Sequence, residues 1–126
     1  MKKIIESAQA PAPIGPYSQA VVANGMVYIS GQIPIDQSTG NLVSGSIEEE
    51  TEQVMKNLGY ILEAAGSGFD KVVKSSIFIK NMGDFAKINA VYGTRFPSNP
   101  PARETVQVSE LPKGVNIEIS CIALVG

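Results

Sequence analysis

A stripe of apolar and small residues between Ile47 and Ala65 is the clearest secondary-structure signal in the chain. Its members recur at steps of four, three, four, three and four residues, which is the period of a helix with one buried face. Ser46 followed by Glu49 is a capping-box pattern, and Gly66 suits a C-terminal cap. The pattern predicts a helix from residue 47 to about residue 65. The stripe consists of Ile47, Thr51, Val54, Leu58, Ile61 and Ala65.

Apolar segments on either side of this helix predict strands. Val21–Ala23 and Met26–Gln32 are joined by Asn24-Gly25, the strongest short hairpin signal, because both residues tolerate positive φ. The segment 34–45, rich in Gly, Asp, Ser and Asn, is expected to be a loop. Residues 72–80 are expected to form a strand. One face of that strand would carry Val73, Ser75, Ile77 and Ile79.

The second half of the chain predicts one more helix and two more strands. Asp84 suits the N-cap of a helix that runs to about Phe96, with Phe85, Ile88 and either Val91 or Tyr92 buried. Prolines in the segment 97–101 must end it. Strands at 103–109 and 115–125 would follow, joined around residues 111–114 and paired antiparallel.

The resulting order β-β-α-β-α-β-β predicts an α+β fold in a single domain, residues 1–126. Both helices are expected to cover one face of the sheet. The other face would then need a cover that a single copy of the chain does not supply. We therefore predict a homo-oligomer.

Composition narrows the possible chemistry. The 126-residue chain has a formal net charge of −2, no histidine and one cysteine. These counts exclude Ser-His-Asp and Cys-His catalysis, an intramolecular disulfide and a CxxC site. Basic residues never run longer than Lys2-Lys3 and the pI is about 5.1, so a nucleic-acid partner is not expected. The longest apolar run, residues 121–125, is too short to span a membrane, and no signal peptide is evident, so we expect a cytoplasmic protein.

Two charged residues are the candidates for chemistry. Alternation places Glu118 on the face of the last strand opposite to its apolar residues, which include Cys121 as a core thiol. Antiparallel pairing with the preceding strand would put Arg103 or Thr105 across from Glu118. One interpretation is a surface ion pair worth roughly 0–1 kcal/mol. The other is a site in which the arginine binds a substrate carboxylate and the glutamate activates water.

Three groups of residues, in order along the chain, resemble the RidA family, also called YjgF or L-PSP. They are Ile14-Gly15-Pro16-Tyr17-Ser18-Gln19-Ala20, Ser30-Gly31-Gln32-Ile33-Pro34, and Pro101-Ala102-Arg103 followed by Leu111-Pro112-Lys113-Gly114 and Ile117-Glu118-Ile119. The similarity runs from about residue 12 to residue 123. It resembles the subgroup with deaminase activity, because both Arg103 and Glu118 are present.

The resemblance implies a chorismate-mutase-like α+β fold assembled as a homotrimer, with sites in the clefts between subunits. It implies hydrolysis of 2-imino acids, such as 2-iminobutanoate and 2-iminopropanoate, to 2-oxo acids and ammonia, with no metal and no cofactor. By this resemblance Arg103 holds the substrate carboxylate, helped by the backbone N–H near Thr105, and Glu118 positions and activates water. The cleft would also be lined by Tyr17, Ser30, Gly31 and Asn89.

Two positions depart from the family pattern. Ser120 stands where many relatives carry a second glutamate, and Thr105 stands where some carry cysteine.

Two other functions compete with the deaminase. One is a non-catalytic regulatory module that binds small carboxylates. The other is a ribonuclease or translation inhibitor, which the absence of histidine and of a basic patch disfavours.

Overall fold

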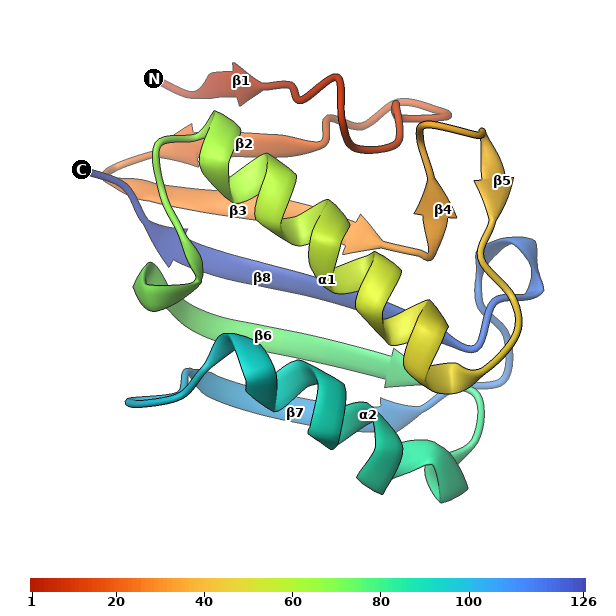
Figure 1. The fold of residues 1–126 in the computed structure, drawn as a ribbon. Helices are drawn as coiled ribbons and strands as arrows, with labels where there is room; N and C mark the ends of the chain where they lie inside the picture. The colour runs from red at the N-terminus through yellow and green to blue at the C-terminus, as the bar shows by residue number, and fades with distance from the viewer.

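A six-stranded sheet with two helices on one face forms the body of the molecule (Figure 1). The structure is a computed structural model that describes residues 1–126. The sheet contains β1 (Lys3–Ile5), β2 (Ala20–Ala23), β3 (Met26–Gln32), β6 (Val72–Ile79), β7 (Ala102–Gln107) and β8 (Ile117–Leu124). Its spatial order is β1-β2-β3-β8-β6-β7. The predicted α+β class is confirmed.

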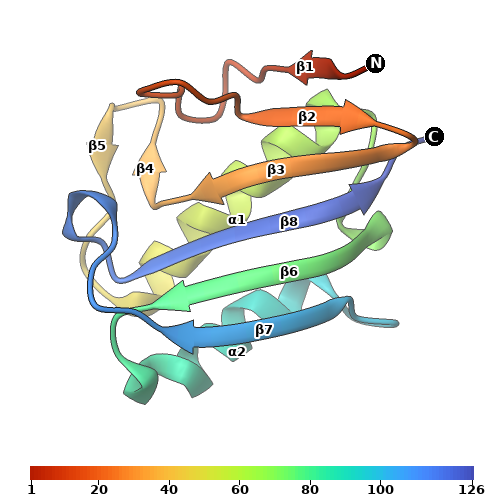
Figure 2. The ribbon, with the colours of Figure 1, turned by 180° about the vertical axis from the view of Figure 1, so that it is seen from behind.

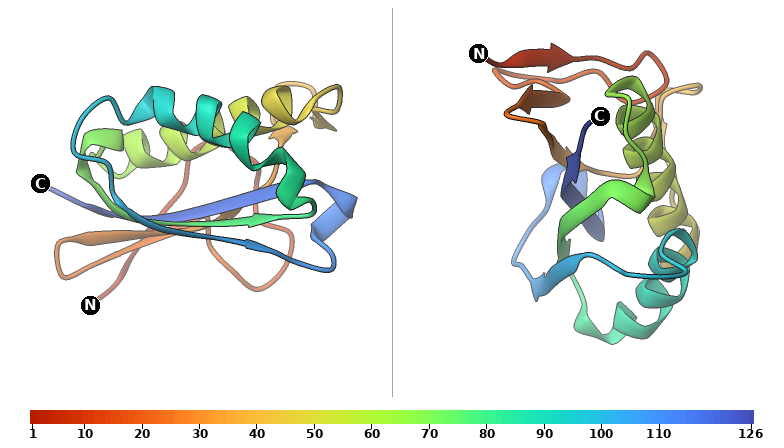
Figure 3. Two further views of the ribbon diagram at one scale, coloured as in Figure 1. Left: turned by 90° about the horizontal axis from the view of Figure 1, so that it is seen from below. Right: turned by 90° about the vertical axis from the view of Figure 1, so that its left-hand side faces the viewer.

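Both helices, α1 (Ile47–Ala64) and α2 (Phe85–Tyr92), lie against the same face of the sheet, as the left view of Figure 3 shows. The main core cluster lies between them and the sheet, and it includes Ile77, Ile117 and Ile119, each fully buried. No helix covers the opposite face (Figure 2), which is called the open face below. None of the helices is long and apolar enough to cross a membrane.

The local signals around α1 are confirmed. Ser46 accepts a hydrogen bond from the backbone N–H of Glu49 at 3.1 Å, and Gly66 has φ +74° just beyond the last turn. All six members of the predicted stripe are buried. The β2–β3 hairpin turns at Asn24 and Gly25 with φ values of 50° and 74°, as the Asn-Gly signal requires.

Two short strand pairings were missing from the sequence-based prediction. The segment 34–45 is not only a loop, because β4 (Ile35–Asp36) pairs antiparallel with β5 (Asn41–Leu42). At the N-terminus, β1 pairs antiparallel with β2. Strands of two or three residues contain too few positions to show a period of two, so long-range pairing decides whether they form.

The prediction that Val73 shares one face of this strand with Ser75, Ile77 and Ile79 is wrong. The register between β6 and β8 shifts between Val72 and Lys74, so Val72 is buried and Val73 is 39% exposed. A bulge of this kind adds a residue to one strand and inverts the alternation beyond it. The other members of the predicted face, Ser75, Ile77 and Ile79, are all buried.

The second helix is shorter than predicted and starts differently. It ends at Tyr92 and continues as one 3-10 turn, Gly93–Arg95. Asp84 makes no capping hydrogen bond through its side chain; Asn81 caps the preceding 3-10 turn, Met82–Asp84, instead. Ile88 and Tyr92 are buried as expected, whereas Phe85 is exposed, contrary to the prediction.

The predicted pairing of the last two strands is also wrong. β7 pairs in parallel with β6, and β6 separates β7 from β8. β6, α2 and β7 therefore form a β-α-β unit, in which a helical crossover returns the chain parallel to its starting strand. The chain then passes β6 between residues 108 and 116 to form β8, antiparallel to both β6 and β3.

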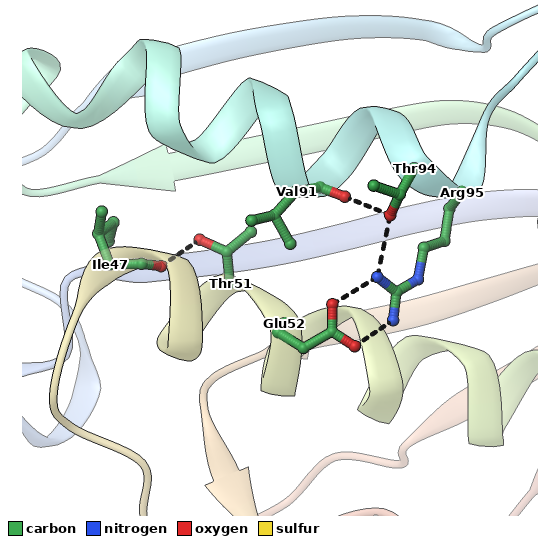
Figure 4. A network of polar contacts seen from close by, with 6 residues as sticks. All are labelled: Ile47, Thr51, Glu52, Val91, Thr94 and Arg95. Atoms are coloured by element: carbon green, nitrogen blue, oxygen red, sulfur yellow. Dashed lines mark hydrogen bonds and ion pairs between the residues drawn. The ribbon is translucent and has the colours of Figure 1, made fainter.

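An ion pair joins the second turn of α1 to the 3-10 turn that follows α2 (Figure 4). Arg95 donates from Nη1 and Nη2 to the two carboxylate oxygens of Glu52 at 2.6 and 2.7 Å. The hydrogen bond from Arg95 is the main reason that the pKa of Glu52 is lowered. Both side chains are partly solvated, so we expect a contribution of at most about 1 kcal/mol to stability. The pair attaches the end of α2, a helix that carries part of the candidate site, to α1.

Candidate active site

A pocket on the open face gathers four of the residues named by the family resemblance. Its volume is about 290 Å³. The register between β3 and β8 shifts between Ile29 and Gln32, so an irregular stretch of strand forms the pocket floor. The lining residues are Tyr17, Ser30, Gly31, Ile33, Pro112 and Glu118.

Glu118 is the only acidic residue in this lining. The side chain is half-buried and forms no hydrogen bond or ion pair within the chain. Burial raises the pKa of its carboxyl group above the usual value. A carboxylate with a raised pKa, open to a pocket and free of partners, is suited to take a proton from water.

Gly31 lets the Glu118 side chain lie directly over β3. A Cβ atom at position 31 would fall 2.5 Å from Oε2 and 2.6 Å from Cδ of Glu118, closer than carbon atoms approach oxygen or carbon without a bond. The glycine is needed here for close approach and not for its backbone angles, because its φ is not positive.

We expect the Gly31→Ala substitution to lower kcat/KM for the reaction proposed below by roughly 10- to 100-fold, because the new methyl group must displace the Glu118 carboxylate by about 1 Å or more. Steady-state kinetics on the purified variant measures this. Gly93→Ala is the matched control, since nothing lies within 4 Å of a Cβ there and its φ is −62°. Equal activity of wild type and Gly31→Ala would contradict the assigned orientation of Glu118.

Two other candidate residues, Arg103 and Asn89, meet on the helix side of the sheet. Arg103 Nη1 donates to Asn89 Oδ1 at 2.8 Å. The guanidinium carbon lies 5.6 Å from the ring centre of Phe85 and 5.1 Å from that of Tyr92, which is cation–π range. Arg103 has no acidic partner in the chain, so most of its donors remain available for a carboxylate.

Sequence reasoning missed the contribution of the two aromatic residues. Phe85, Asn89 and Tyr92 are spaced by four and three residues and therefore share one face of α2. Tyr92 is held in place by a hydrogen bond of 2.9 Å from its hydroxyl to Ser75 Oγ. The helical spacing of these three residues is visible in the sequence. Their contact with Arg103 is not, because β7 lies beside α2 only in the tertiary structure.

Arg103 and Glu118 of one chain do not face each other, contrary to the predicted cross-strand pair. In the sheet register Arg103 is opposite Ser75 of β6, whereas Glu118 is opposite Phe78 of the same strand. Their side chains point to opposite faces of the sheet. A surface ion pair between them within one subunit is therefore ruled out as well.

Thr105 lies on the same face of β7 as Arg103, two residues further along. Its Oγ1 is buried and has no hydrogen-bond partner.

On β8, which lies on the other side of β6, Cys121 is buried, and burial raises the pKa of its thiol to about 12. Cys121 is the core thiol that its strand position predicts.

Gln19, which sequence reasoning also missed, fixes the arm that leads to Tyr17. Its side chain is buried and makes four hydrogen bonds to the backbone, one from Ser7 N and three to the carbonyls of Ser7, Ala10 and Pro11. Tyr17 itself accepts a hydrogen bond from Ile14 N at 3.3 Å.

The chain contains no group of three or more His, Cys, Asp or Glu side chains arranged to hold a metal ion.

The fold, together with the Glu118 pocket and the Arg103–Asn89 pair, places the chain among small α+β proteins with two helices on one sheet face. The family model described as Endoribonuclease L-PSP matches residues 7–125. The chain belongs to this family, which is the RidA family indicated by the sequence motifs.

Individual relatives are similar over the whole length. The human protein named 2-iminobutanoate/2-iminopropanoate deaminase is 48% identical over 126 residues, which is 100% of this chain and 92% of that one. A crystal structure of a conserved Rid family protein from Yersinia pestis has a TM-score of 0.97 at 49% identity, covering 99% of this chain and 100% of the other. TdcF of E. coli, solved with bound serine, has a TM-score of 0.92 at 38% identity, covering 98% and 99%.

Proposed function

We propose that this protein is a hydrolytic deaminase of 2-imino acids, with 2-iminobutanoate and 2-iminopropanoate as substrates. The observation that carries the proposal is the half-buried Glu118 carboxylate, free of partners in a pocket that also contains Tyr17 and Ser30. Arg103 supplies the matching anion-binding group. The names of the mammalian relatives at 48% identity support the same chemistry. We also propose the cytoplasm as the place of action.

The reaction needs a positioned water molecule and one group that moves protons. A protonated imine is already electrophilic, so water adds to its carbon while Glu118 accepts a proton from the water. Glu118 then returns that proton to the nitrogen of the carbinolamine. As Glu118 takes the proton of the new hydroxyl group, the C–N bond breaks, and the departing ammonia takes up this proton as ammonium. The products are a 2-oxo acid and ammonia. Arg103, with the backbone N–H near Thr105 and with Asn89 beside it, would hold the substrate carboxylate in two parallel hydrogen bonds.

We further propose that each complete site is built by two copies of the chain within a homotrimer. Arg103 and Glu118 are on opposite faces of one sheet, so a single chain does not bring them to one substrate. The open face carries Tyr28, Val106 and Leu124, each more than 40% exposed, as expected for a surface that a second copy covers.

A coupled assay tests the activity. Threonine dehydratase would generate 2-iminobutanoate in the presence of semicarbazide, which traps the imine. We expect this protein to divert the imine to 2-oxobutanoate and to suppress formation of the imine-derived semicarbazone. Saturable binding of 2-oxobutanoate without any diversion would instead favour the regulatory module that binds small carboxylates.

A mixing experiment tests the shared site. The Arg103→Ala and Glu118→Gln chains, each inactive alone, would be unfolded together at equal amounts and refolded. Random assembly should give about a quarter of all sites an intact Arg103 and an intact Glu118, and thus about a quarter of wild-type activity. The mixture of separately refolded variants is the control. No recovery in co-refolded, fully assembled protein would contradict a site made by two subunits.

A further inference from the structure

The end of β8 that carries Glu118 is paired with a neighbouring strand on one side only. The last pair between β3 and β8 is Gln32 with Ile119, so Glu118 has no partner in β3. On the other side, β6 continues to pair with β8 at Glu118 and Ile117. β8 begins at Ile117. Glu118 therefore lies near the end of a strand, where a backbone is more mobile than in the middle of a sheet unless another element holds it.

Glu50, in the first turn of α1, holds this strand end from the helix layer. Its two carboxylate oxygens accept hydrogen bonds from Asn116, Oε1 from the backbone N–H at 3.2 Å and Oε2 from Nδ2 at 2.7 Å. Asn116 directly precedes β8, and its carbonyl accepts a hydrogen bond from Lys80 N at 3.1 Å. In Figure 1 the start of α1 lies beside the start of β8. Asn116 is thus bound to α1 on one side and to the residue that follows β6 on the other.

The Glu50 carboxylate is used entirely for this contact. Glu50 is only 6% exposed and forms no ion pair, and its side chain accepts hydrogen bonds from Asn116 alone. Burial of a carboxylate is costly unless its oxygens are paired, and the nearby helix N-terminus, where negative charge is favoured, offsets part of this cost. Two acceptor oxygens match the two donors of Asn116, whereas a side-chain amide offers one acceptor only. A carboxylate therefore fits this position better than an amide.

The segment that Glu50 holds supplies two lining residues of the Glu118 pocket. These are Pro112 and Glu118, and Asn116 lies between them in the sequence. The Glu118 carboxylate is in close contact with β3 over Gly31, so its position depends on where the start of β8 lies. A displacement of Asn116 passes through two residues of backbone to the carboxylate that accepts the proton, and a small misplacement of such a group slows a reaction strongly.

We propose that Glu50 is a positioning residue: through Asn116 it fixes the start of β8 and thereby the place of the Glu118 carboxylate. Glu50 itself does not line the Glu118 pocket. Because Arg103 is held by α2 and not by α1, Glu50 should act on kcat and leave binding of the substrate carboxylate unchanged. The effect on turnover rests on the proposed function; the effect on the order of residues 116–118 does not.

Kinetics of Glu50→Gln test the effect on turnover, with Glu48→Gln as the matched control. Glu48 lies in the same turn of α1 and is exposed, so its replacement makes the same change of charge without removing the contact to Asn116. We expect Glu50→Gln to lower kcat by roughly 5- to 50-fold with KM within about twofold of wild type, and Glu48→Gln to change neither. A lowered melting temperature with unchanged kcat in folded Glu50→Gln would show a purely structural role and overturn the proposal.

A double variant tests the two hydrogen bonds themselves. In Glu50→Gln/Asn116→Asp the donor and acceptor roles of the side chains are exchanged, so the new amide donates to the new carboxylate and still accepts from the backbone N–H of residue 116. Asn116→Asp alone should be slow, because two carboxylates then face each other. The double variant should recover most of the kcat lost in either single variant. Absence of this recovery in the folded double variant would contradict the proposal.

Backbone ¹⁵N relaxation gives a readout that does not depend on imine hydrolysis. Glu50→Gln should increase the mobility of residues 116–118, and so should Asn116→Ala, a milder change at an exposed residue. The double variant should restore the wild-type values, and residues 72–79 of β6 should be unaffected throughout. Unchanged mobility of residues 116–118 in both single variants would overturn the proposal. If wild type fails to divert the imine, the proposed function is wrong, and the relaxation data still decide whether Glu50 holds this strand end.

Discussion

Replacing Arg103 by alanine is expected to lower kcat/KM for 2-iminobutanoate by roughly 100- to 1,000-fold, because two charge-assisted hydrogen bonds to the substrate carboxylate are lost. The guanidinium has one fixed hydrogen bond, to Asn89, and two aromatic faces against it, so it is already oriented for a carboxylate. The coupled semicarbazide assay measures the loss.

The matched variant for this test is Arg103→Lys. It keeps the positive charge but not the planar fork of donors, so it should recover only a small part of the activity. Size-exclusion chromatography of both variants should show the same assembly as wild type, because the hydrogen bond and both cation–π contacts of this side chain are made to α2 of its own chain. Wild-type turnover in Arg103→Ala would remove this residue from carboxylate binding.

The Glu118→Gln substitution is expected to reduce kcat by roughly 100- to 10,000-fold and to leave binding of 2-oxobutanoate within a few-fold of wild type. Glutamine has the same shape but accepts no proton, so the pocket is preserved and the base is lost. Steady-state kinetics and isothermal titration calorimetry measure the two quantities.

The pH profile gives a second test of the same residue. Burial raises the pKa of Glu118, and only the ionised form accepts a proton from water. The wild-type rate should therefore fall as the pH drops through this raised pKa. The residual rate of Glu118→Gln should not show this decrease at acidic pH. If the rates of both proteins decreased equally at acidic pH, the titrating group would be one other than Glu118. Wild-type turnover in the variant would exclude Glu118 as the base.

Several elements were predictable from the sequence because their signals are local. The Ser46 cap and the apolar stripe predicted α1, and Asn24-Gly25 predicted the β2–β3 hairpin. The alternation along β8 correctly put Cys121 in the core and Glu118 on the other face. Each of these features is decided by residues within about one turn or one strand of each other.

Errors arose where distant segments decide the result. The bulge that exposes Val73 depends on the register of β6 against β8, and the exposure of Phe85 depends on where α2 lies over β7. Antiparallel pairing of the last two strands is the simplest connection, but the β6–α2–β7 crossover inserts β6 between them. That insertion moved Arg103 away from Glu118.

By itself, the sequence determined the class of fold, the family and the residue types available for chemistry, because periodicity, turn residues and motifs are written in short stretches of chain. Only the tertiary structure decided that Arg103 and Glu118 lie on opposite sides of one sheet. It also decided that Gly31 makes room for a carboxylate. These relations join residues as far apart in the sequence as Gly31 and Glu118, and only strand order, register and close packing bring such residues together.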